Sequence, residues 1–202
     1  MKRIVLLLLV AASMGGFTLS AQTVNSLENG KYSLSVGDVT LTVDASRGGK
    51  IVSYKYKDTE ILSQTRMPNS FGSTFWTSPQ SEWNWPPVPE YDTKPFNAEV
   101  TDGKLVLTGE KSKRFGYKVR KEFVADTKDN AIVITYTLIN ESGETRKVAP
   151  WEISRVPNGG ILFFDAKEVT PANNMAGLPF VYEKKAAWYV LDEDRVNRKI
   201  NA

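Results

Sequence analysis

The residues best suited to binding chemistry gather in one stretch of the chain, residues 71–91. Three of the five tryptophans, Trp76, Trp83 and Trp85, lie in it. Polar side chains lie among them, at Gln80, Glu82, Asn84 and Glu90. A sugar packs its C–H face on flat aromatic rings, while amides and carboxylates bind its hydroxyl groups, so this composition predicts a carbohydrate-binding site. The alternative is a hydrophobic plug of indole rings folded onto a sheet.

Two glutamates, Glu82 and Glu152, are the candidate catalytic acids. Glu82 and Glu90 flank Trp83 and Trp85. Glycoside hydrolases use two carboxylates that lie about 5–10 Å apart across the scissile bond. Nothing in the sequence fixes that separation for two residues of one loop.

Glu152 follows Trp151 on an expected strand, so the two side chains point to opposite faces unless Pro150 introduces a bulge. If Trp151 faces a site, it is a stacking platform. If Glu152 faces it, the carboxylate is a hydroxyl acceptor or an acid of raised pKa. The alternative places Trp151 in the core and pairs Glu152 with Arg146 or Arg155.

Four further residues could bind a sugar directly. The amides of Asn69 and Gln80 could bind neighbouring hydroxyl groups, or could cap their own turns. The planar guanidinium groups of Arg66 and Arg155 suit the carboxylate of a uronate, and the alternative for both is a surface ion pair.

No histidine and no cysteine occur in the chain. Their absence excludes Ser-His-Asp triads, Cys-His dyads and ordinary zinc sites. Proton transfer is left to carboxylates, Lys, Tyr and Arg, and only a hard cation with oxygen ligands could be bound. We expect neither a metal nor a cofactor.

Residues 1–21 have the pattern of a secretory signal peptide, with Lys2 and Arg3, an apolar run and the small-residue end Leu19-Ser20-Ala21. The mature domain, residues 22–202, is therefore expected in the periplasm or outside the cell. Without a cysteine it is not lipid-anchored, and no second apolar run is long enough to span a membrane. The net charge of +3 falls to +1 without Lys2 and Arg3, which does not favour nucleic acid as a partner.

Alternating apolar and polar residues, separated by turn residues, predict an all-β antiparallel sandwich. Gly48-Gly49 is expected to be a β-turn, because no phosphate-loop spacing or helix follows it. Prolines at 79, 86, 87 and 89 favour one long loop over 71–91, neither helical nor an interior strand. The expected strands are 31–36, 39–44, 51–57, 60–62, 97–101, 104–109, 115–125, 131–139, 146–154, 161–164, 178–182 and 187–191.

Several of these segments resemble the galactose-mutarotase-like (aldose epimerase-like) superfamily. The turn and strand Gly48-Gly49-Lys50-Ile51-Val52-Ser53, closed by Glu60-Ile61-Leu62, is similar to the opening of its domains. More specific segments resemble an uncharacterised exported bacterial branch of that superfamily. They are 71–80, Trp83-Asn84-Trp85-Pro86-Pro87, and Trp151-Glu152-Ile153-Ser154 after the strand at 136–140. The resemblance covers residues 39–156.

The resemblance implies a supersandwich of long curved strands with sugars held on a concave face. Aldose epimerases of the superfamily move protons with a histidine and a C-terminal glutamate. The matching stretch at 148–152 has no histidine, and no strand carrying that glutamate precedes Ala202, so the activity is not carried over. The tail at 192–202 is charged and has no closing apolar strand, so either it is disordered or the chain ends before its sheet does. The superfamily's domains are longer, which favours truncation at the C-terminus.

The leading hypothesis is an exported carbohydrate-binding domain of mutarotase-like fold without the catalytic histidine. One alternative is a sugar-active enzyme, an epimerase or glycoside hydrolase that uses Glu152 or Glu82. Another is an envelope structural or interaction protein whose aromatic loop is a protein contact. The residues expected to bind ligand are Asn69, Trp76, Gln80, Trp83, Trp85, Trp151 and Arg155.

Overall fold

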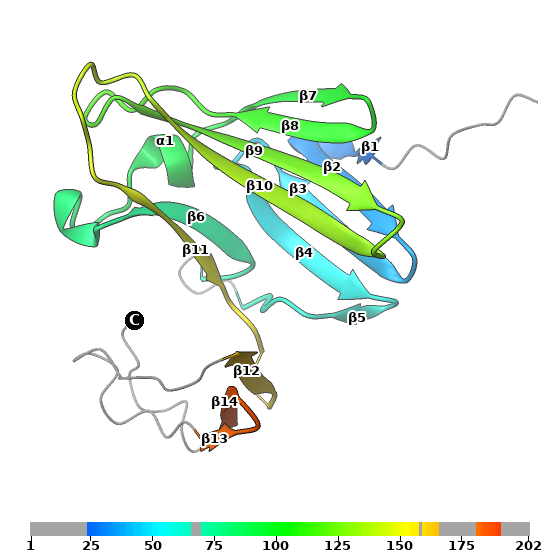
Figure 1. Cartoon of the computed structure of the whole chain (residues 1–202). Helices are drawn as coiled ribbons and strands as arrows, with labels where there is room; N and C mark the ends of the chain where they lie inside the picture. Colours follow the sequence, from blue (N-terminus) through cyan, green and yellow to red (C-terminus); the bar gives the residue numbers. More distant parts are fainter. Residues whose placement is uncertain (1–23, 66–69, 158, 166–180, 191–202) are drawn as a thin grey trace, which may run out of the picture.

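The computed structural model describes residues 24–65, 70–157, 159–165 and 181–190. In this part the chain forms antiparallel sheets joined by turns, and the predicted all-β sandwich is confirmed (Figure 1). The expected signal peptide, Arg66 and Asn69 lie outside the described residues.

The larger sheet, sheet A, has the strand order β1-β2-β3-β4-β6-β11, and β5 pairs with β4. The hairpin of β2 and β3 lies where the sequence predicts it, with Gly37 and Asp38 between the two strands. The 3-10 turn η1 (Glu28–Gly30) joins β1 to β2. The strands are β1 (Val24–Ser26), β2 (Lys31–Val36), β3 (Val39–Asp44), β4 (Lys50–Tyr56), β5 (Thr59–Glu60), β6 (Ser73–Ser78) and β11 (Ala149–Ser154).

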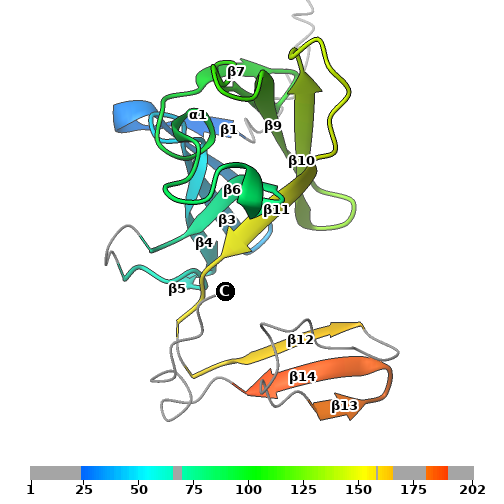
Figure 2. The same ribbon diagram turned by 90° about the vertical axis from the view of Figure 1, so that its left-hand side faces the viewer.

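The second sheet, sheet B, is a meander in the order β10-β9-β8-β7. Its strands are β7 (Asn97–Thr101), β8 (Lys104–Thr108), β9 (Tyr117–Asp126) and β10 (Ala131–Asn140). A third, small sheet follows β11 in the chain, in the order β12-β14-β13 (Figure 2). It contains β12 (Ile161–Asp165), β13 (Val181–Glu183) and β14 (Ala186–Val190).

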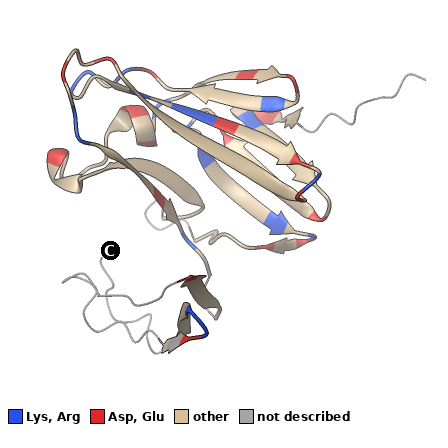
Figure 3. Ribbon diagram, viewed as in Figure 1, with Lys and Arg blue, Asp and Glu red and all other residues tan. Residues whose placement is uncertain are grey.

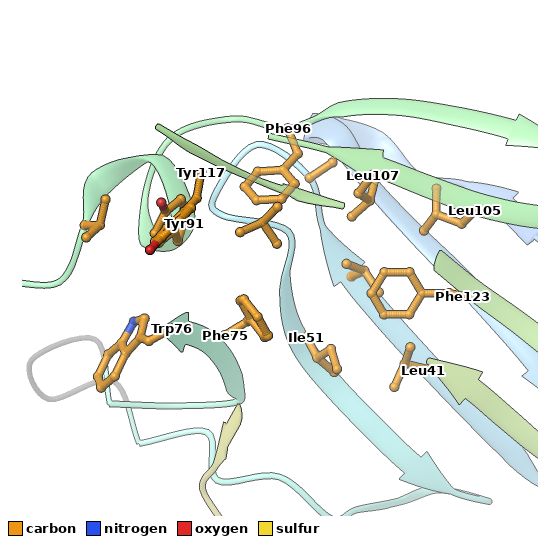
Figure 4. Close-up of a cluster of buried hydrophobic side chains, with 14 of the residues drawn as sticks. Leu41, Ile51, Phe75, Trp76, Tyr91, Phe96, Leu105, Leu107, Tyr117 and Phe123 are labelled. Carbon is orange, nitrogen blue, oxygen red and sulfur yellow. The ribbon is translucent and has the colours of Figure 1, made fainter. Parts of the chain in front are cut away.

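The core lies between sheets A and B. Alternate residues of β9 point inward, and Val119 and Phe123 meet Leu34 and Leu41 from sheet A. Fully burying one such side chain contributes about 1.5–3 kcal/mol, so this layer supplies much of the stability. The aromatic residues Phe75, Phe96, Tyr91 and Tyr117 close the end of the core that lies beside β6 (Figure 4). Four residues of β10 pack against the core: Ile132, Ile134, Tyr136 and Leu138.

The prediction of a single loop over 71–91 is wrong at both ends. Ser73–Ser78 is β6, an interior strand between β4 and β11, and Pro89–Asp92 is the short helix α1. The prolines all follow Ser78, so none interrupts the aromatic and β-branched residues of β6. Pro89 occupies the first helical position, where its missing N–H has no intrahelical partner to lose. The loop is therefore confined to residues 79–88, which include the 3-10 turn η2 (Gln80–Glu82).

None of the helices in the described ranges has the length and apolar character needed to cross a membrane. Lys, Arg, Asp and Glu are interleaved along both large sheets (Figure 3).

Phe75 tests this packing. Its ring is buried and stacks on Tyr136, with the ring centroids 4.7 Å apart. Phe75→Ala should lower the free energy of unfolding by about 3–5 kcal/mol, because it leaves a cavity between the sheets. The measurement is urea unfolding followed by tryptophan fluorescence. Val133→Ala, at an exposed position of β10, is the control and should change the free energy by less than about 1 kcal/mol. Equal effects at both positions would contradict the assigned core.

Candidate functional site

The pairing of β6 with β11 sorts the candidate site residues onto two faces of sheet A. Trp151 lies opposite Trp76, and Glu152 lies opposite Phe75. The register runs without a shift from Ala149 to Ser154, so Pro150 introduces no bulge. Trp151 and Glu152 therefore point to opposite faces, as predicted. Trp151 lies on the same face as Trp76, which we call the outer face, while Glu152 lies on the face of Phe75 and is itself exposed.

Four tryptophans cluster on the outer face. The ring of Trp76 meets Trp83, Trp85 and Trp151 edge-on, at centroid distances of 5.7, 6.0 and 5.7 Å. Trp76 and Trp83 are only 8% and 3% exposed, whereas Trp85 is 69% exposed. The indole N–H groups of the buried pair donate to Asp92 Oδ1 at 2.9 Å and to the Thr77 carbonyl at 2.9 Å. Trp83 therefore fits the interpretation of the loop as a hydrophobic plug. Trp85 instead exposes its ring to solvent, as the binding-site interpretation requires.

A pocket of about 220 Å³ opens beside Trp76 and Trp85. It is smaller than the roughly 300–1,000 Å³ of pockets for drug-sized ligands, and so suits a single ring-sized group. Its other described lining residues are Arg47, Lys50, Ser70, Thr74, Pro86, Pro87, Asp92 and Arg155.

Arg155 is the predicted ligand residue that the structure places most clearly in the pocket. Its Nη1 donates to Thr74 Oγ1 at 3.1 Å, and its guanidinium carbon lies 6.0 Å from the Trp76 ring centroid. Burial lowers the pKa of Arg155, and the charges of Asp92 and Glu152 act against this. The guanidinium is therefore oriented and partly desolvated, which strengthens its interaction with an anion.

Two more cations border the same pocket. Lys50 is 3% exposed, and its ammonium lies 4.0 Å from the centroid of the Phe71 ring. Arg47 lies over the same ring at 5.8 Å. Against these two and Arg155, Asp92 is the single carboxylate among the described lining residues. The pocket therefore combines aromatic rings with an excess of positive charge.

The inner face of the β6–β11 pair carries a polar group around Glu152, whose side chain is itself exposed at the edge of the sandwich. Ser73 donates a short hydrogen bond to Glu152 Oε1, and the Tyr136 hydroxyl interacts with the same carboxylate. Partial desolvation by its neighbours raises the pKa of Glu152, and the Ser73 hydrogen bond and the Lys121 charge offset this only in part. Neither predicted ion pair forms, because Arg146 pairs with Glu144 and Arg155 donates to Thr74.

Lys121 is the residue in this region that sequence reasoning missed. It is 2% exposed, and its ammonium donates to the carbonyls of Gly48 and Gly49 at 2.8 and 3.1 Å. Burial lowers the pKa of Lys121 to about 8, against the opposing charges of Glu152 and Asp92. The alternation of β9 could have predicted that Lys121 points inward, because Lys121 falls between the inward-facing Val119 and Phe123.

The remaining predicted residues are not brought to the pocket. Gln80 is exposed on η2 and donates to the Asn84 carbonyl at 3.4 Å, so it caps its own loop. Glu90 is buried on α1, pairs with Lys94 at 3.1 Å and does not line the pocket. Glu82 accepts, through its backbone carbonyl, a hydrogen bond from Arg114 at 2.8 Å. Glu82, Trp83 and Trp151 do not line the pocket.

Comparison of the chain with protein-family models, curated proteins and solved structures found no match.

The buried ammonium of Lys121 predicts a pH dependence of stability. The unfolded pKa of lysine is about 10.4, and the folded pKa of Lys121 is about 8. Between these values the unfolded state binds more protons, so the free energy of unfolding rises with pH. Deprotonation of Lys121 alone should raise the free energy of unfolding by about 2 kcal/mol between about pH 7.5 and 9.5.

Urea unfolding at these two pH values measures the increment. Lys121→Met should lose it, whereas Lys118→Met, on the more exposed face of the same strand, should retain it. If Lys121→Met keeps the same rise with pH, Lys121 is not the group that titrates.

Proposed function

We propose that this protein is a carbohydrate-binding domain that holds one sugar ring in the pocket between Trp76, Trp85 and Arg155. The supporting observation is the exposed Trp85 ring, held edge-on to the buried Trp76 at the margin of a small polar pocket. A sugar stacks on an indole face and directs its hydroxyl groups to donors and acceptors such as Arg155, Thr74 and Asp92. The resemblance to mutarotase-like domains favours the same class of ligand.

The arrangement of acids favours binding over turnover. Hydrolysis by a pair of acids needs two carboxylates on either side of the bond. Asp92 is the single carboxylate in the described pocket lining, and Trp76 donates to it. Glu152 lies on the other face of the β6–β11 pair, so the sheet separates it from a sugar stacked on Trp85. Export to the periplasm or beyond, expected from the leader pattern, suits a protein that meets glycans outside the cytoplasm.

Trp85→Ala tests the proposed contact. The mutation should weaken sugar binding at least tenfold, because it removes the exposed stacking surface, a loss of about 1.4 kcal/mol or more. Stability should change little, since the ring is mostly exposed. A glycan array identifies a ligand, and calorimetric titration then compares the variant with the unchanged chain.

Tyr56→Ala is the matched control, because Tyr56 is an exposed aromatic residue of the same sheet outside the pocket. It should bind the glycan normally. Equal binding by Trp85→Ala and the unchanged chain would refute the proposal. A homodimer that buries Trp85, with no glycan able to compete, would support the interaction-protein alternative instead.

Glu152→Gln separates the binding function from the enzymatic alternative, which the raised pKa of Glu152 favours. We expect the variant to bind the glycan as tightly as the unchanged chain, and we expect neither protein to turn over aldoses or glycosides. The readouts are calorimetric titration and NMR of the anomeric protons. Turnover by the unchanged chain that Glu152→Gln abolishes, with binding intact, would make the protein an enzyme.

A further inference from the structure

A second hollow adjoins the Trp85 pocket on the outer face of sheet A. Its volume is about 490 Å³, and Arg47 lines both spaces. The Phe71 ring, beneath the cations of Arg47 and Lys50, lines the second hollow beside the first. The two hollows are therefore neighbouring parts of one surface across β3, β4 and β6.

The charges along this surface are unequal. Among the described lining residues, five cations stand against three carboxylates: Lys31, Arg47, Lys50, Lys55 and Arg155 against Asp44, Glu60 and Asp92. The surface therefore carries a net positive charge, although the whole chain without residues 1–21 is close to neutral.

The three carboxylates already accept hydrogen bonds from the protein. Asp92 accepts from the Trp76 indole, and Asp44 accepts from the Ser46 amide and hydroxyl. Glu60 accepts from the Ser53 hydroxyl and from the amides of Tyr54 and Leu62. Burial would raise the pKa of Glu60, but these hydrogen bonds outweigh it and lower the pKa, so the group stays ionised.

Three of the cations are less committed than the carboxylates. Within the described part of the chain, Lys31, Arg47 and Lys55 form no ion pair with a carboxylate. Arg155 uses one nitrogen for Thr74 and keeps further N–H donors in a planar fork that matches a carboxylate or sulfate. A neutral sugar would leave this excess of positive charge uncompensated.

We propose that the two hollows bind an acidic oligosaccharide, with one ring against Trp85 and its anionic group at Arg155, and a second acidic unit between Arg47 and Lys55. This assignment rests on the proposed carbohydrate binding and specifies its ligand class. The shared chemistry is an anionic group on each bound sugar, whether a uronate carboxylate or a sulfate ester. Arg47, which borders both hollows, interacts with both units.

The experiment compares four probes by calorimetric titration: galacturonate, tetragalacturonate, a sulfated heparin tetrasaccharide and the neutral maltotetraose. At least one acidic tetrasaccharide should bind tenfold or more tightly than maltotetraose. The affinity of that tetrasaccharide should fall severalfold between low and high salt, because salt screens the partly exposed cations of the two hollows. The two acidic probes tell a carboxylate ligand from a sulfate ligand.

Three substitutions test which hollow binds which unit of the oligosaccharide. Arg155→Gln, in the first hollow, should weaken the monosaccharide galacturonate and the tetrasaccharide alike, if carboxylates are bound. Lys55→Gln, in the second hollow, should weaken the tetrasaccharide and leave the monosaccharide unchanged. Arg47→Gln should weaken the tetrasaccharide about tenfold. Lys128→Gln, in the exposed β9–β10 turn, removes the same charge elsewhere and should have no effect.

The failures of the two proposals are distinguishable. If maltotetraose binds as tightly as the acidic probes, in a manner that depends on Trp85 but not on salt, the acidic ligand is wrong and the carbohydrate site stands. If Lys128→Gln weakens binding as much as Arg47→Gln, the positive surface acts only through net charge and the proposal is overturned. If no glycan binds, both proposals fail.

Discussion

The register between β6 and β11 is the constraint on which the rest of the site depends. Side chains alternate across a strand, so pairing Trp76 with Trp151 also pairs Phe75 with Glu152 on the opposite face. A slip of one residue would place Trp76 over the core and move Phe75 into solvent. The aromatic pocket outside and the polar group inside are therefore two consequences of one set of backbone hydrogen bonds.

Lys121 shows how the sandwich tolerates a buried charge between its sheets. The Lys121 ammonium lies 5.3–5.8 Å from the ring centroids of Phe75, Phe96 and Tyr136, whose faces attract a cation. Its hydrogen bonds to the Gly48 and Gly49 carbonyls join β9 of sheet B to the turn before β4 of sheet A. An apolar side chain would leave two buried carbonyls without these donors, a loss of about 1–3 kcal/mol each. The lysine thus fixes how one sheet sits on the other.

Local patterns predicted most of the strands, and contacts between distant segments decided the rest. The hairpin joined by Asp102 and Gly103 follows from alternation and turn residues alone. Local patterns do not identify β6, because the prolines after Ser78 favour a loop for the whole of 71–91. These prolines in fact leave Ser73–Ser78 free to form a strand. Trp83 and Trp85 have the same chemistry and differ only in what packs against them, so their burial could not be read from residue type. The pairing of Trp76 with Trp151 joins segments far apart in the chain, which no local pattern encodes.

The backbone of Gly48 contacts the segment that follows the loop of residues 79–88, around α1. Its N–H donates to the Lys94 carbonyl at 2.8 Å, just after α1, and its φ of +62° suits glycine. A Cβ atom at Gly48 would lie 2.3 Å from the carbonyl oxygen of Asp92, so the backbone packs directly on the turn. The loop that carries Trp85 is thus fixed by β6 at one end and by this contact at the other. Ordering a free loop opposes association by about 1–2 kcal/mol of conformational entropy per residue, and here that entropy is lost on folding, before a ligand arrives.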